Sequence, residues 1–249
     1  MIFLLFVLDL CIITSTSDIY SVVKEIAPFQ TEVLNLVPEG SCPGHFDLSP
    51  REAGFLNRAD LIIYHGFEPW IKKIRKINSK VKLIDLKTDE SWMVPSVYLK
   101  GALEICEVLK MEMEDSSNRK LIEENYKRLI SKIDSLSLKI MLKRDSLNGI
   151  KVICNEYQRE FLSFLGMEVI STFPKEEKLT LKELSNILNI GKEKNVEIVV
   201  DNLQTRGKIG RMIAIELSKP FVILSNFPDR KGYKETVLDN IKIILEGLK

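Results

Sequence analysis

The most constraining feature of this 249-residue sequence is an uninterrupted helical segment in its middle. No proline or glycine occurs between Ser116 and Leu147. Apolar residues recur there in alternating steps of four and three, the spacing of one helical face: Ile122, Tyr126, Leu129, Ile133, Leu136 and Ile140. Asp115 or Ser116 can cap the start, and Asn148-Gly149 can end the helix. A helix of about 30 residues is a rod of roughly 45 Å, which is either a core helix, a coiled-coil arm or a strut between two lobes.

Short β-rich runs alternate with helical patterns on both sides of this segment. The runs before it are residues 11–15, 31–38, 59–66 and 81–86. The runs after it are residues 150–154, 167–173, 196–201 and 220–225. Strands that alternate with helices predict parallel sheets covered by helices. We therefore expect an α/β fold with two parallel-sheet α/β lobes joined by one long backbone helix. The expected divisions are an N-terminal lobe at 1–114, a linking helix at 115–148 and a C-terminal lobe at 149–249.

Composition and missing signatures exclude several classes of function. Lys and Arg total 36 and Asp and Glu total 35, so the chain has no basic footprint for nucleic acid. The four cysteines are too few and too scattered for a disulfide scaffold. Neither a phosphate-binding loop nor a dinucleotide-binding glycine pattern occurs, which argues against nucleotide use. No G-x-S-x-G elbow is present, which argues against an α/β-hydrolase.

The first ten residues, MIFLLFVLDL, are apolar except for Asp9 and lack the basic residues of a secretory leader. They are either a buried strand that continues into Cys11 or an unusual export leader or anchor. No apolar run in the chain reaches the 18 or so residues of a typical membrane span.

Polar residues follow several predicted strands, at the sheet edge where open parallel sheets bind their ligands. The only two histidines, His45 and His65, follow strands of the first half, and Glu156 and Asp201 follow strands of the second. Imidazole and carboxylate suit a divalent transition metal such as zinc, manganese, iron or cobalt. Cys42 lies three residues before His45, and its thiolate would shift the preference toward zinc.

Each of these residues also has a structural interpretation. A histidine in a loop is more often a surface or capping residue than a ligand. Asp201 can cap the helix that begins near Gly207. Cys106, in an apolar helix, and Cys154, at the end of a buried strand, are typical packing residues.

The ordered set of segments resembles a known family over almost the whole chain from Ile12. The segments that carry the resemblance are TSTSDIYSVVKEI, EVLNLVPEG, ADLIIYHGFEPWIKKI and VVDNLQTRGKIGRMIAIEL. In this order they resemble the solute-binding proteins of zinc/manganese-type ABC importers, whose two lobes share a rigid backbone helix.

The resemblance implies a metal site with a changed set of ligands. His45 stands at the family's first metal histidine, and Glu156 aligns with a later ligand after the first strand of the second lobe. Glu90 replaces a histidine, His65 replaces a common asparagine, and Asn226 stands where the family usually has an aspartate. The chain therefore looks like a divergent branch, with His45, His65, Glu156, Asp201 and Cys42 as its candidate ligands and Glu90 as a weaker one.

The resemblance implies a non-enzymatic, monomeric receptor outside the cytoplasm, at the periplasm or cell surface. It would deliver a divalent metal, zinc or manganese, to an ABC permease in the membrane, and each lobe would contribute ligands. One alternative is a cytoplasmic two-lobed chelatase that inserts a divalent ion into a tetrapyrrole; the weak leader favours it and the long helix disfavours it. Another is a receptor for a metal chelate in place of a bare ion.

Overall fold

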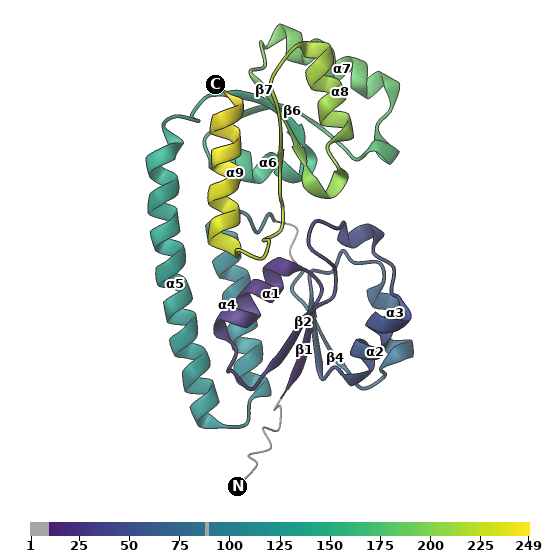
Figure 1. Ribbon diagram of the computed structural model, residues 1–249, viewed down its shortest axis with the longest axis vertical. Coiled ribbons are helices and arrows are strands. Elements are labelled where there is room, and N and C mark those ends of the chain that lie inside the picture. The colour runs from purple at the N-terminus through teal and green to yellow at the C-terminus, as the bar shows by residue number, and fades with distance from the viewer. Residues whose placement is uncertain (1–9, 88–89) are drawn as a thin grey trace. The chain divides into compact units, whose positions relative to one another are not determined.

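The computed structural model describes residues 10–87 and 90–249, which form two compact units (Figure 1). Unit 1 comprises Met1–Asp89 and Leu99–Lys132, and unit 2 comprises Glu90–Tyr98 and Ile133–Lys249. The predicted leader, anchor or strand at the N-terminus lies outside the described residues except for Leu10. No helix in the described part of the chain has the length and apolar composition needed to cross a membrane.

Unit 1 contains a four-stranded parallel sheet in the order β2-β1-β3-β4. Its strands are β1 Cys11–Thr14, β2 Glu32–Asn35, β3 Leu61–Tyr64 and β4 Lys82–Asp85. Helices α2 (Pro50–Arg58) and α3 (Ile71–Ile77) cover one face, and α1 (Ser17–Ile26) and α4 (Pro95–Glu112) cover the other (Figure 1). The central strands β1 and β3 read as apolar runs because both faces of the sheet are covered there. Ile13 and Ile62 of the sheet pack with Leu56, Trp70 and Ile74 beneath α2 and α3.

The long helix α5 spans Ser116–Arg144 and links the two lobes. Five of the six residues of its predicted apolar stripe are buried, which are Ile122, Leu129, Ile133, Leu136 and Ile140. In unit 1 the helix is tied to α1 because the side-chain amide of Asn125 donates to the Ile26 carbonyl at 3.2 Å. The helix ends at Arg144, shortly before the predicted stop at Asn148-Gly149, and the chain turns at Gly149 with a φ of 79°. The predicted fold class is confirmed.

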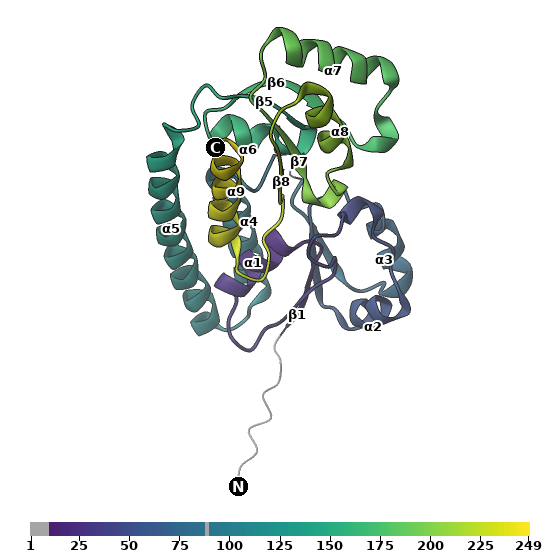
Figure 2. The ribbon, with the colours of Figure 1, turned by 45° about the horizontal axis from the view of Figure 1, so that its top comes forward.

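Unit 2 contains a second four-stranded parallel sheet in the order β6-β5-β7-β8. Its strands are β5 Lys151–Asn155, β6 Glu168–Phe173, β7 Ile198–Asn202 and β8 Phe221–Leu224. Helices α7 (Leu181–Glu193) and α8 (Lys208–Leu217) lie on one face, and α6 (Arg159–Phe164) and α9 (Tyr233–Gly247) lie on the other (Figure 2). Ile153 and Val199 of the sheet pack with Ile187, Ile213 and Leu217 of α7 and α8.

The segment Glu90–Tyr98 belongs to unit 2, although it precedes α5 in the chain. The rings of Tyr98 and Tyr233 stack with centroids 3.7 Å apart. The Tyr233 hydroxyl donates to the Met93 carbonyl at 3.2 Å, and all three residues are buried. Buried aromatic stacking and a buried hydrogen bond therefore hold this segment against α9.

Candidate metal-binding residues

His65 follows β3 and is buried against the start of α1. Its ring Nε2 lies 3.1 and 3.2 Å from the two carboxylate oxygens of Asp18, in the first turn of that helix. Asp18 also accepts the N–H of Ile19 at 2.8 Å. The side chain that the sequence offered as a ligand is therefore an ion-pair partner within unit 1.

The pKa of His65 is raised above its ordinary value of 6.5. Burial lowers it by penalising the charged ring, but the charge of Asp18 and its hydrogen bond raise it, with smaller contributions from Glu68 and Asp85. The environment as a whole therefore favours the protonated ring.

The turn after His65 is fixed by a second buried carboxylate. Glu68 accepts the backbone N–H of His65 at 3.0 Å and that of Gly66 at 2.9 Å. Gly66 has a φ of 101°, and a Cβ there would lie 2.7 Å from Asp85 Oδ1, so glycine is required. The turn directs Phe67 outward, where its ring stacks on His65 at 5.2 Å and is 51% exposed.

Cys42 directly precedes the short helix Pro43–His45 in the loop after β2, and His45 is the last residue of that helix. The backbone N–H of His45 donates to the Cys42 carbonyl at 3.1 Å, which closes this turn. The His45 side chain is exposed and that of Cys42 is half-buried. Both donors thus lie at the surface of unit 1, and His45 is the more accessible.

Glu156 follows β5 and is exposed in unit 2. It begins the short helix Glu156–Gln158, whose start is capped because the buried Asn155 side chain accepts the Tyr157 N–H at 3.1 Å. The residue is held on a defined turn, and it is exposed. An exposed carboxylate can coordinate a cation without having been taken out of water when the protein folds, so folding carries no desolvation cost for it.

Asp201, at the end of β7, is engaged by donors of its own unit. One carboxylate oxygen accepts the Asn202 N–H at 2.7 Å and the Thr205 hydroxyl at 3.0 Å. The other accepts the Gly210 N–H in α8 at 2.8 Å, and the residue is 1% exposed. The contact with Gly210 matches the capping interpretation of Asp201, because it satisfies a backbone donor in the first turn of α8.

Uncharged amides occupy the neighbouring strand ends. Gln158 donates to the Asn226 side-chain oxygen at 2.7 Å, and the Asn226 N–H donates to Gln204 Oε1 at 3.2 Å. Gln204 in turn donates to the Ser225 hydroxyl at 3.2 Å. Asn226, at the position of the family's usual aspartate, is therefore part of a hydrogen-bonded amide cluster.

The structure brings two of the candidates onto adjacent turns of unit 2. In unit 2, β5 and β7 are neighbours with Cys154 beside Val200, so Glu156 and Asp201 lie at adjoining strand ends. Over residues 10–87 and 90–249, no three His, Cys, Asp or Glu side chains are grouped so as to hold a metal ion.

Burial raises the pKa of the Cys154 thiol to about 12, so this cysteine stays protonated at neutral pH.

Comparison with known proteins assigns a family. A family model described as "Zinc-uptake complex component A periplasmic" (ZnuA) matches residues 12–247. The chain belongs to the ZnuA family. A protein of Thermotoga maritima, described as a candidate metal-binding protein, is 24% identical over 93% of this chain and 84% of its own length.

Solved structures share the fold over nearly the whole chain. A zinc-bound deletion mutant of ZnuA has a TM-score of 0.83 at 20% identity, covering 96% of this chain and 98% of the other. Lmb of Streptococcus agalactiae, an adhesin with metal transporting activity, has a TM-score of 0.79 at 19% identity, covering 96% and 100%. FpvC of Pseudomonas aeruginosa, in complex with Ni²⁺, has a TM-score of 0.80 at 15% identity, covering 96% and 96%.

Sequence reasoning missed Asp18 and Glu68, the two buried carboxylates around His65. Asp18 reads as an ordinary acidic residue in the first turn of a helix. Glu68 lies three residues after His65, and that short spacing was the available signal. Their role depends on burial and on the pairing of β1 with β3, which the local pattern does not give.

Proposed function

We propose that this protein is a receptor outside the cytoplasm that binds a divalent transition metal, zinc first and manganese second, and passes it to an ABC permease. The observation that carries the proposal is the family match across residues 12–247, which includes both sheets and α5. The proposed role involves no bond-making chemistry. The chelatase alternative has no comparable support.

His45 and Glu156 are the ligands in this proposal. Both are exposed, and both sit on short helices that follow strand carboxyl ends, His45 in unit 1 and Glu156 in unit 2. Neutral imidazole and ionised carboxylate are ligands that zinc and manganese accept in proteins. Cys42 is a third donor if the metal is zinc, because thiolate favours softer ions.

His65 and Asp201 act as positioning residues in this proposal. The Nε2 of His65 faces Asp18. One oxygen of Asp201 accepts the Asn202 N–H at the end of β7, and the other accepts the Gly210 N–H in the first turn of α8. If either residue were to bind the metal, it would have to give up these buried hydrogen bonds. The loss of each bond would cost on the order of 1–3 kcal/mol.

The test is calorimetric titration of protein purified without chelators, with zinc and with manganese in a non-coordinating buffer. We expect one metal ion per chain and a loss of at least tenfold in affinity in the His45→Ala and Glu156→Gln variants. Glu177→Gln, a change at another exposed carboxylate of unit 2, is the matched control and keeps the wild-type affinity. Unchanged affinity in both ligand variants would reject the ligand assignment.

The location outside the cytoplasm is tested separately. Cell fractionation with mass spectrometry of the mature N-terminus reports where the protein resides and whether residues 1–10 are retained. We expect the protein in the periplasmic or cell-surface fraction. Recovery in the cytoplasm alone would reject the receptor role, whatever the metal affinity.

A further inference from the structure

Helix α3 of unit 1 has an apolar inner side and a basic outer side. Its three isoleucines are buried or half-buried. Its other four residues are exposed cations, which are Lys72, Lys73, Arg75 and Lys76. Lys72 and Lys76 are one helical turn apart, and like charges at this spacing weaken a helix. Lys72 and Lys73 also lie in the first turn, where the helix dipole disfavours cations. Helix stability therefore does not account for these two lysines.

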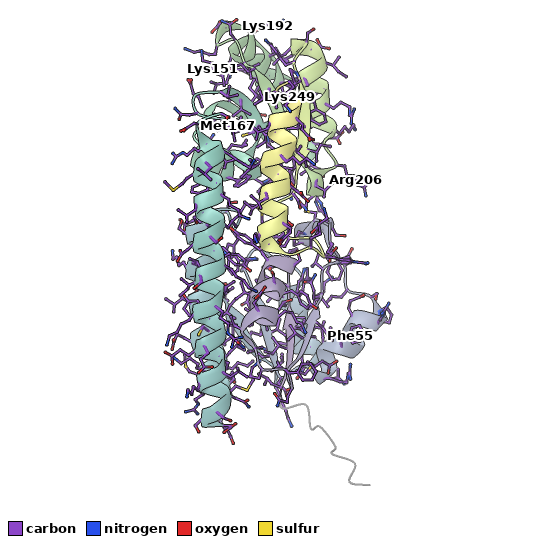
Figure 3. The ribbon with its side chains drawn as sticks, turned by 60° about the vertical axis from the view of Figure 1, so that its left-hand side comes forward. Phe55, Lys151, Met167, Lys192, Arg206 and Lys249 are labelled. Atoms are coloured by element: carbon purple, nitrogen blue, oxygen red, sulfur yellow. The ribbon has the colours of Figure 1, made fainter. Side chains whose placement is uncertain are left out.

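Helix α2 adds two guanidinium groups beside α3. The two helices contact each other on the same face of the sheet (Figure 1, Figure 2). The guanidinium carbons of Arg51 and Arg58 lie 5.8 and 5.9 Å from the centroid of the Phe55 ring, which Figure 3 labels at the edge of unit 1. Asn78, directly after α3, donates to the Leu56 carbonyl at 3.1 Å. This bond holds the ends of the two helices together, so their cations belong to one surface.

The acidic residues near these helices are directed to other donors. The carboxylates of Glu52, Asp60 and Glu68 accept backbone N–H groups at 2.9, 2.8 and 3.0 Å. In the described part of unit 1, none of the three forms an ion pair with a cation of α2 or α3. Asp47 lies 3.8 Å from the Lys73 ammonium, and an exposed pair of this kind contributes little.

Most cations of this surface are left without an acidic partner. Over residues 50–80, seven Lys and Arg stand against three Asp and Glu, whereas the whole chain is balanced at 36 and 35. Arg75 donates to two carbonyls that follow α3, which explains its position. The remaining cations form what we call the basic face, which consists of Arg51, Arg58, Lys72, Lys73, Lys76 and Lys80. Among the described residues, only Lys73 of this set has an ion-pair partner.

The basic face suits a fluid anionic surface better than a folded protein. Stable protein–protein interfaces have an apolar core. In α2 and α3, which the structure describes in full, no large apolar side chain is exposed. The exposed ring of Phe67, in the turn before α3, stacks on His65. Clusters of about four to eight Lys and Arg bind anionic lipid head groups through charge alone, without such a core.

We propose that the basic face of unit 1 contacts the phosphate groups of an anionic phospholipid bilayer. Lys72 and Lys76, on the outermost line of α3, lie at the centre of the contact, and the guanidiniums of Arg51 and Arg58 extend it along α2. The contact is reversible and sensitive to salt, because its charges are exposed. It involves neither of the proposed ligands His45 and Glu156, so it does not depend on metal binding.

Cosedimentation of the full chain with lipid vesicles tests the inference. Vesicles of phosphatidylcholine are compared with vesicles in which phosphatidylglycerol replaces a third of that lipid. We expect at least tenfold stronger binding to the anionic vesicles, and we expect high salt to remove the difference. Any contribution of the apolar residues 1–10 is common to both kinds of vesicle and cancels in the comparison.

Charge reversal assigns the binding to this surface. The double variant Lys72→Glu/Lys76→Glu should lose at least tenfold in binding to anionic vesicles, because two attractive charges become repulsive. The matched control is Lys24→Glu/Lys120→Glu, which reverses two exposed lysines on α1 and α5 of the same unit. The control should bind within about twofold of wild type. Circular dichroism checks that both variants are folded.

The possible failures are distinguishable. Equal binding to neutral and anionic vesicles, or an equal loss in the control variant, would overturn the inference. Binding of soluble polyglutamate without binding of anionic vesicles would overturn the lipid assignment in favour of an acidic protein partner. Each of these results leaves the metal-receptor proposal intact, because the zinc titrations of His45→Ala and Glu156→Gln test that proposal without lipid.

Discussion

Asp18 and His65 form an ion pair that is closed to solvent, with Nε2 3.1 Å from Oδ2 and each side chain 2% exposed. The pair joins the first turn of α1 to the end of β3, 47 residues apart in sequence. It therefore fixes the turn that carries Gly66 and Phe67. A buried pair of this kind is costly to break, because removing one partner leaves the other charge without compensation.

The pair should make stability depend on pH. The pKa of folded His65 is raised, so the contribution of its charge to stability is complete below the unfolded value of about 6.5. That contribution is lost as pH rises through the folded pKa. In urea unfolding, the free energy of unfolding of wild type should exceed that of His65→Gln by about 1–3 kcal/mol at pH 5.5 to 6. This difference should narrow toward pH 9. A constant difference across this range would contradict the charged pair.

Asp201→Ala should destabilise the protein by about 2–4 kcal/mol, because it leaves the donors of Asn202, Thr205 and Gly210 without an acceptor. Denaturant unfolding measures this loss, and Asp145→Ala, at an exposed aspartate, is the control. The folded fraction of this variant should bind zinc with an affinity within about twofold of wild type. A loss of folding stability lowers the amount of folded protein and leaves the affinity of the folded protein unchanged. A large loss of affinity with unchanged stability would make Asp201 a ligand instead.

Gly66→Ala should cost at least about 1–2 kcal/mol, because the residue has a φ of 101° and its new Cβ would meet the Asp85 carboxylate. Gly54→Ala is the matched control, since Gly54 lies within α2 and a Cβ there meets nothing within 4 Å. That substitution should stabilise the helix by up to about 1 kcal/mol. Thermal unfolding should move in opposite directions for the two variants, and equal shifts would contradict the description of the turn.

Tyr233→Phe should destabilise the protein by about 1 kcal/mol, since it removes the hydrogen bond to the Met93 carbonyl and keeps the ring stack. Tyr233→Ala also removes the stack on Tyr98 and should cost about 3–5 kcal/mol. Protease cleavage within residues 90–98 should increase in the alanine variant and stay slow in the phenylalanine variant. Equal cleavage in wild type and Tyr233→Ala would show that this segment is held by other contacts.

The architecture was predictable because its signals are local. The apolar stripe from Ile122 to Ile140 has a helical period whatever it packs against, and the central strands β1 and β3 are apolar runs because both sheet faces are covered there. The expected divisions at 114 and 148 stay a prediction. The attachment of Glu90–Tyr98 to unit 2 depends on Tyr98 meeting Tyr233 far along the chain, which no local pattern reports.

The candidate site was predictable only in part. Its position at strand carboxyl ends follows from the topology of open parallel sheets. The roles of individual residues depend on partners distant in sequence. The contacts of His65 with Asp18, and of Asp201 with the Gly210 N–H, join residues that no local pattern pairs. The five candidates His45, His65, Glu156, Asp201 and Cys42 stay predictions, and the proposed function keeps His45, Glu156 and Cys42 as ligands and gives His65 and Asp201 a positioning role.

The most direct test of the central claim is a zinc titration of wild type and His45→Ala. The account predicts one zinc bound per chain by wild type and at least tenfold weaker binding by the variant, with the fold retained by circular dichroism. Absence of zinc binding by wild type would contradict the account.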